Sequence, residues 1–222
     1  MILNRRRFLG VFGLGSAGLI ITPGGAVPHA HSGPLRPAEP ALPFVGPLDQ
    51  GRHEPPLLAR AKAALAQHGR SIAHHDTVGI VDFAAPSRQP RFHLLDMATG
   101  KVSTHLVAHG RGSDPANSGW VEQLSNRPGS NASCGGSFVT GEIYHGKHGR
   151  SRRLIGLERE NDMAGPRGIV IHAASYVDDG MAQSHGRIGR SQGCFAVSQG
   201  DIDMVLARLG PGRLLLATRL SS

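Results

Sequence analysis

The chain has 222 residues, of which 39% are hydrophobic, and its formal net charge is +8 at neutral pH. This length supports one good-sized hydrophobic core with short appendages. With 31 glycines and 15 prolines, the composition argues against a fold of long helices and favours strands, turns and linkers. A basic surface suits an anionic partner, such as nucleic acid, a membrane surface or an acidic cell-envelope polymer.

The first 30 residues are typical of a secretory signal peptide. A basic head over residues 5–7 precedes an apolar stretch over residues 8–21, which is short for a membrane span of about 20 residues. The Arg-Arg-x-Phe-Leu core resembles the twin-arginine export signal, with Gly10 where that pattern often has lysine. We therefore expect a periplasmic or extracellular protein that uses the twin-arginine translocation machinery and keeps no stable membrane anchor after signal removal. The alternative interpretation is a soluble basic tail or an uncleaved anchor.

The next segment, residues 31–56, is rich in proline and predicts an extended linker, because proline resists both helices and sheet ladders. A helix is expected over residues 57–68, between Pro56 and Gly69. Its apolar residues recur at helical spacing: Leu57, Leu58, Ala61, Ala64 and Leu65.

From about residue 70 onward, the pattern predicts strands with few helices. The expected strands cover residues 78–83, 91–97, 101–108, 137–144, 168–172 and 214–218. The second and third flank a turn at Thr99-Gly100, and the continuous apolar character of the fifth indicates burial on both faces. One further helix is expected over residues 199–209, ended by Gly210 and Pro211.

Cys194 is the candidate nucleophile, in the turn Ser191-Gln192-Gly193-Cys194. An unassisted thiol is mostly protonated at neutral pH and needs a base to become the reactive thiolate. His172 ends an apolar strand, and its imidazole can accept this proton and later return it. Gly193 allows a sharp bend, so that the amide of Cys194 or of a neighbour points at an oxyanion, with Ser191 and Gln192 supplying hydrogen bonds around it.

Other interpretations of these residues compete with this one. In an oxidising compartment, Cys134 and Cys194 are candidates for a structural disulfide, which would block a nucleophile. His185 is the rival base and lies nearer to Cys194 in the sequence, but in a polar loop, so we favour His172. Because the remaining histidine pairs lack an obvious carboxylate partner, we expect no metal site and no cofactor. These pairs are His74 with His75 and His145 with His148.

From residue 91 to residue 220, the sequence resembles the L,D-transpeptidase catalytic domain of the YkuD type. That family has a histidine at a strand end, a loop, a Ser/Thr-His-Gly-Cys motif and then a helix that often opens with Asp. Here these are His172, residues 173–190, Ser191-Gln192-Gly193-Cys194 and Asp201. Glutamine replaces the motif histidine, and Phe-Ala replaces the usual apolar-Arg pair after the cysteine, which is similar to a divergent branch of murein L,D-transpeptidases. The resemblance implies a mainly β fold, a β-sandwich of mixed sheets with a few short helices, and a catalytic domain over residues 57–222.

The resemblance also implies the role of each site residue. Cys194 attacks a peptide carbonyl and forms a thioester, and His172 is the general base, oriented by a backbone carbonyl. The amides of Gly193 and Cys194 are the oxyanion donors. Arg190 and Ser191 line the donor site, and Arg190 or Arg187 supplies the charge that a peptide carboxylate needs. For Tyr144 and Tyr176 we favour a packing role over a hydroxyl contributed to the site.

The expected function is that of an exported cysteine acyltransferase acting on peptidoglycan stem peptides. Two alternatives stay open: an L,D-carboxypeptidase or cross-link hydrolase on the same scaffold, and a non-enzymatic β-sandwich that binds the acidic cell wall. Nucleic-acid binding is disfavoured by the export signal and by the low aromatic content of 5%.

Overall fold

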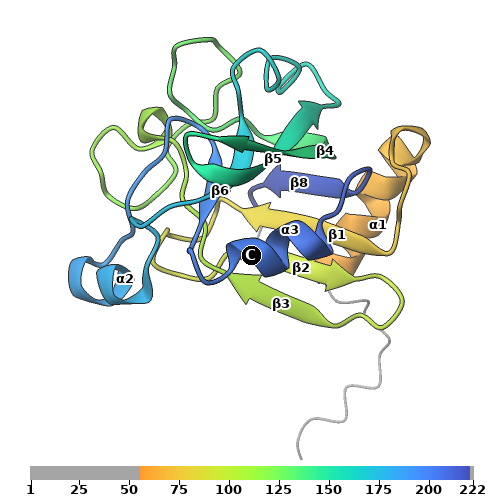
Figure 1. Ribbon diagram of the computed structural model, residues 1–222, viewed down its shortest axis with the longest axis horizontal. Helices are drawn as coiled ribbons and strands as arrows, with labels where there is room; N and C mark the ends of the chain where they lie inside the picture. Colours follow the sequence, from red (N-terminus) through yellow and green to blue (C-terminus); the bar gives the residue numbers. More distant parts are fainter. Residues whose placement is uncertain (1–55, 221–222) are drawn as a thin grey trace, which may run out of the picture. The chain divides into compact units, whose positions relative to one another are not determined.

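The computed structural model describes residues 56–220 (Figure 1). The expected signal peptide over residues 1–30, and all but the last residue of the expected linker, lie outside the described residues. The described residues belong to one compact unit, Gln50–Ser222. Among them, no helix is both long and apolar enough to cross a membrane.

Within residues 56–220, the regular structure consists of eight strands and three α-helices (Figure 1). The strands are β1 (Thr77–Asp82), β2 (Phe92–Asp96), β3 (Val102–His105), β4 (Gly136–Gly146), β5 (Gly149–Gly156), β6 (Val170–Ala173), β7 (Phe195–Val197) and β8 (Leu214–Thr218). The helices are α1 (Pro56–His68), α2 (Asp179–His185) and α3 (Ile202–Arg208), with short 3-10 helices at Gly69–Ser71 and Arg111–Ser113.

All eight strands are linked in one mixed sheet, in the order β3-β2-β1-β8-β4-β5-β6-β7. The pairs β1–β8 and β6–β7 are parallel, and the other neighbours are antiparallel. The expected mainly β class with mixed pairing is therefore confirmed. The turn between β2 and β3 lies at Thr99-Gly100, as expected from the sequence. It is stabilised by the Asp96 carboxylate, which accepts hydrogen bonds from the Ala98 and Thr99 amides, and by Gly100, which has a φ of +71°.

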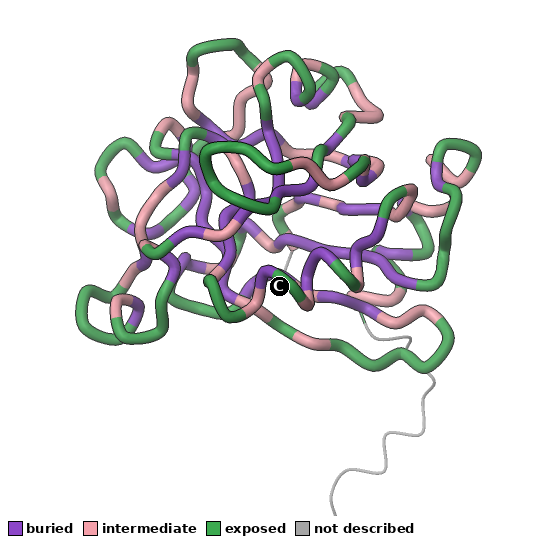
Figure 2. Tube along the Cα trace, viewed as in Figure 1, coloured by how far each residue is buried: buried purple, intermediate pink, exposed green. Residues whose placement is uncertain are grey.

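The two ends of this strand order come together. Beyond β3, the Ala108 amide donates to the Ala196 carbonyl of β7 at 2.8 Å, and Gly110 forms a bridge with Ser191. The sheet thus curls around its largest hydrophobic cluster. Figure 2 shows buried residues along the inner segments of the chain and exposed residues mainly on the outer loops. This closure brings the segment after β3 against the turn that contains Cys194.

Helices α1 and α3 cover opposite faces of the sheet. On β1, Ile80 packs in the cluster that contains Ala61 and Ala64 of α1, whereas Val81 packs in the cluster that contains Val205 and Leu206 of α3. Successive side chains of a strand point to opposite faces, so adjacent residues enter different clusters. The cluster that contains Val205 and Leu206 is the largest one, and it also holds three aromatic rings that stack or pack edge to face, those of Phe83, Phe138 and Phe195.

Three elements are absent from the sequence-based expectations: β5, α2 and β7. The arginine-rich sequence of β5, Gly-Arg-Ser-Arg-Arg-Leu-Ile-Gly, lacks the apolar alternation of a half-buried strand. The strand expected over residues 101–108 ends at His105, and only an isolated bridge at Ala108 follows. β6 is buried at Val170, Ile171 and His172, which confirms the expected burial on both faces.

Candidate active site

Adjacent parallel strands place His172 and Cys194 on the same face of the sheet. In the register of β6 and β7, Ile171 lies opposite Phe195 and His172 opposite Ala196. Ile171 and Phe195 both point into the main core. Because side chains alternate along a strand, His172 and Cys194 point to the other side. There, both line one cavity of about 880 Å³.

The ring of His172 is oriented by a backbone carbonyl, as the sequence suggests. Its Nδ1 lies 2.8 Å from the carbonyl oxygen of Ala173. A carbonyl only accepts, so Nδ1 carries the proton and Nε2 keeps the lone pair that a general base needs. Burial lowers the pKa of His172, an effect that the bond to Ala173 opposes. The ring of His148 stacks on that of His172, with centroids 4.2 Å apart.

The thiol of Cys194 is held in its protonated form. Burial raises its pKa, while the Val170 amide and the charges of Lys147 and Arg167 act in the opposite direction. Sγ lies 3.5 Å from the carbonyl oxygen of Gly168, which accepts the weak thiol bond. The directions of these two pKa shifts favour a neutral thiol at Cys194 and a neutral imidazole at His172 in the cavity that both residues line.

The turn before Cys194 requires glycine at position 193. Gly193 has a φ of +118°, and a Cβ there would lie 2.7 Å from the carbonyl oxygen of Ala132. The hydroxyl of Ser191 spans the turn: it accepts from the Gly193 amide at 3.0 Å and donates to the Cys194 carbonyl at 2.7 Å. The Gly193 amide, expected as an oxyanion donor, is thus engaged within the turn, because its hydrogen bonds the Ser191 hydroxyl.

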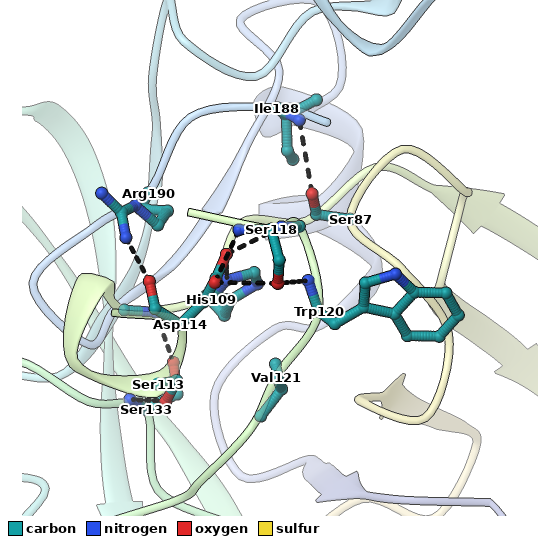
Figure 3. A network of polar contacts seen from close by, with 12 residues as sticks. Ser87, His109, Ser113, Asp114, Ser118, Trp120, Val121, Ser133, Ile188 and Arg190 are labelled. Atoms are coloured by element: carbon teal, nitrogen blue, oxygen red, sulfur yellow. Dashed lines mark hydrogen bonds and ion pairs between the residues drawn. The ribbon is translucent and has the colours of Figure 1, made fainter. Parts of the chain in front are cut away.

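A polar network that includes His109, Asp114 and Arg190 is hydrogen-bonded to this turn; Figure 3 shows these three residues. The Ser191 amide donates to the His109 carbonyl at 2.9 Å. The His109 ring bridges Arg91 Nη2, 2.7 Å from Nδ1, and the Asp114 carboxylate, 3.3 Å from Nε2. Since arginine only donates, His109 is neutral with its proton on Nε2; burial, followed by the charge of Arg91, lowers its pKa to about 4. Arg190, which directly precedes Ser191, donates to the Asp114 carbonyl and is thereby attached to the same network.

Of the other expected residues, Tyr144, Arg190, Ser191 and Gln192 line the cavity, as does Tyr176. Burial raises the pKa of Tyr176 to about 12, and the guanidinium of Arg153 lies 4.4 Å from the ring centre of Tyr144. Both tyrosines therefore also pack against neighbours.

The two residues that offered alternative interpretations, His185 and Cys134, do not line the cavity, and Cys134 forms no disulfide with Cys194. His185 ends α2 with an exposed side chain bonded to Ser184, and it is not among the residues that line the cavity. Cys134 is wholly buried, and both cysteines are free thiols in this structure. Within residues 56–220, no three His, Cys, Asp or Glu side chains are grouped so that they could hold a metal ion.

Among the cavity-lining residues that were not assigned to the site from the sequence, three are ionisable: Lys147, His148 and Arg167. Lys147 and His148 form the tip of the β4–β5 hairpin, between Gly146 and Gly149. The glycines on either side are the signal for a tight turn, but only the register of the hairpin brings that tip over His172.

Comparison with known proteins identifies the class of protein that this site and fold define. Residues 50–217 match the family model described as L,D-transpeptidase catalytic domain. The chain belongs to this family of cell-wall enzymes, which act on peptidoglycan stem peptides.

Solved structures that resemble the chain include an L,D-transpeptidase from Mycobacterium smegmatis, with 13% identity and a TM-score of 0.40 over 64% of this chain and 58% of that one. L,D-transpeptidase 3 from Mycobacterium tuberculosis, in complex with a faropenem-derived adduct, has 12% identity and a TM-score of 0.41 over 65% and 60%. The helical cell shape determining protein Pgp2 from Campylobacter jejuni has 13% identity and a TM-score of 0.40 over 75% and 57%. The chain thus spans less than two thirds of each structure. No curated protein matches the sequence.

Proposed function

We propose that the protein is an exported cysteine acyltransferase that forms a thioester with peptidoglycan stem peptides. The observation that supports this most directly is that His172, on β6, and Cys194, directly before the neighbouring parallel strand β7, line the same cavity. The tautomer of His172, with Nε2 free to accept a proton, supports it further.

The proposed acylation begins with two neutral groups. Nε2 of His172 accepts the thiol proton while Sγ of Cys194 attacks the carbonyl carbon of the donor peptide. The negative charge on the carbonyl oxygen then needs a donor, and we assign this role to the amide of Cys194, because that of Gly193 is engaged by Ser191. The intermediate collapses to the thioester as the C–N bond breaks and His172 returns its proton to the leaving amine of the terminal D-residue.

The second half-reaction transfers the acyl group from sulfur to an acceptor. An acceptor amine loses a proton to His172, attacks the thioester carbon and leaves the thiol of Cys194 regenerated. Water in place of the amine gives the hydrolytic outcome on the same residues. Product analysis distinguishes the two, because the transfer product keeps the acceptor and the hydrolytic product does not.

Intact-protein mass spectrometry with a disaccharide-tetrapeptide tests the proposal. We expect a covalent adduct on the native chain and release of the terminal residue. Cys194→Ala abolishes the adduct. His172→Ala slows its formation by about 10²-fold or more, which is the usual contribution of a general base.

His185→Ala serves as the matched control, because this side chain is exposed and outside the cavity, and adduct formation is expected at the native rate. Native activity in the His172→Ala chain would contradict the assignment of the base. The absence of any adduct on the correctly folded native chain would contradict the proposed activity.

A further inference from the structure

Two cavities of the described structure carry opposite charge. The cavity that contains Cys194 is lined by three cationic side chains, Lys147, Arg167 and Arg190, and no aspartate or glutamate is among its lining residues. A second cavity of about 610 Å³ is lined instead by three carboxylates, those of Asp178, Asp179 and Asp201. The positive charge is thus concentrated around the candidate nucleophile and is not a general property of the hollows in this basic chain.

The guanidinium groups of Arg167 and Arg190 are held in place without being neutralised. Arg167 donates to the Ser125 carbonyl at 2.7 Å, to the Ala132 carbonyl and to the Ser130 hydroxyl at 3.3 Å. Arg190 donates to the Asp114 carbonyl. These acceptors carry no formal charge, so both arginines are ordered in advance and keep their full attraction for an anion.

Lys147, the third cation that lines the cavity, lies at the exposed tip of the β4–β5 hairpin. The arginines of this hairpin have other partners: Arg150 pairs with Asp203, Arg152 donates to the carbonyls of Gly141 and Leu206, and Arg153 lies over Tyr144. Lys147 has no carboxylate partner in the described part of the chain. Its charge is close enough to act on Cys194 and His172.

We infer that this cleft selects donor stem peptides whose side carboxylates are free acids over those in which they are amidated, and that Lys147 is the specificity-determining residue. The inference rests on the proposed function and names the substrate class of the same site. A free carboxylate gains an ion pair with a cation that is otherwise unpaired, whereas a carboxamide of the same shape does not.

Two tetrapeptide donors that differ only in the amidation of their side carboxylates test the inference. The second-order rate constant of thioester formation is measured for the full chain with each donor by intact-protein mass spectrometry. At about 50 mM salt, we expect the free-acid donor to react about tenfold faster, and we expect this ratio to fall at about 500 mM because salt screens exposed charges.

Lys147→Gln is expected to narrow the ratio to within about threefold, on the scale of an exposed ion pair. Because Lys147 also acts on the thiol, its loss changes both rate constants, and the ratio alone reports recognition. Lys101→Gln is the matched control: Lys101 is an exposed lysine in the β2–β3 turn, outside the cavity, and its replacement leaves the ratio at the native value.

Equal rate constants for the two donors would overturn the inference while leaving the proposed function in place. A native ratio in the Lys147→Gln chain would overturn the role of Lys147. If neither donor forms a thioester, the proposed function itself fails, and this outcome is separate from the loss of selectivity.

Discussion

Cys194 and His172 have proton affinities that disfavour an ion pair before substrate binds. Burial raises the pKa of the thiol and lowers that of the imidazole, so neither group carries charge at neutral pH. In the proposed acylation, transfer of the proton from thiol to imidazole therefore accompanies the attack on the peptide. The cations Lys147 and Arg167 partly offset the cost of the thiolate, which links the charge of the cleft to the reactivity of the nucleophile.

The pH dependence of alkylation tests the state of this thiol. Iodoacetamide reacts with the thiolate, and a raised pKa delays ionisation as the pH rises, so the midpoint at Cys194 should lie above the unperturbed value of 9.0. Peptide mapping assigns the label to Cys194 and separates it from Cys134. The same chain in denaturant is the control, and its midpoint should be lower. A folded-state midpoint below that of the denatured chain would instead indicate a resting thiolate–imidazolium pair.

At the scale of single residues, the sequence predicts the chemical pair but not its surroundings. Cys194 and His172 are recognisable because a local turn of small residues and an apolar strand end mark them. Lys147 and His148 enter the site through the pairing of β4 with β5, a contact between strands that no local pattern specifies. The sequence does not predict the hydrogen bond from the Gly193 amide to the Ser191 hydroxyl either, because this bond depends on the conformation of the turn.

Between elements, the cluster of Arg91, His109 and Asp114 connects the start of β2 to the turn that contains the nucleophile. Arg91 is wholly buried and also donates to the carbonyls of Val107 and Ala85. The backbone carbonyl of His109, a member of this cluster, accepts a hydrogen bond from the Ser191 amide. Its members form a continuous series of hydrogen bonds, so the loss of one leaves buried partners unpaired.

Replacement of Arg91 tests this connection. Arg91→Leu leaves the carbonyls of Ala85 and Val107 and the Nδ1 of His109 without their donor, and it removes a cation that interacts with the charge of the buried Asp114 carboxylate. We therefore expect a loss of about 3–5 kcal/mol in the free energy of unfolding. Urea unfolding measures the loss. Arg88→Leu is the matched control, since this exposed arginine lies over the ring of Trp120 and outside the buried cluster, and a change within about 1 kcal/mol is expected. Equal stability of the two variants would show that the cluster contributes little.

The sequence predicts the strands and helices whose apolar residues recur at the spacing of a strand or a helix. β1, β2, β8 and α3 lie where their periodicity indicates, because their apolar faces are what the sheet buries. β5 is missed because Arg152 is buried although it is charged: its two Nη atoms donate to the carbonyls of Gly141 on β4 and Leu206 on α3, while its Nε has no hydrogen-bond partner among the described residues. A charged residue can lie inside a sheet when the fold supplies such acceptors, and the sequence does not show them.

At the scale of the whole domain, the curl of the sheet connects the candidate active site to the main core. Phe195, directly after Cys194, packs against Phe83 and Phe138 from other parts of the sheet. On the same strand, Ala196 accepts the hydrogen bond from Ala108 that joins the two ends of the strand order. The position of the nucleophile therefore depends on the same contacts that hold the sheet together, whereas α2 buries only Ala182 and contributes little to them.

Hydrogen exchange measured by mass spectrometry tests this coupling. We expect the Ala108 amide to exchange as slowly as the central strand β1, since both open only on global unfolding, and α2 to exchange much faster through local opening. Phe195→Ala should destabilise the core by about 3–5 kcal/mol and accelerate exchange at Ala108 and in β1 by the same factor. Exchange at Ala108 as fast as in α2 would show that the sheet opens at this edge independently, and the site would then be a separately mobile part of the fold.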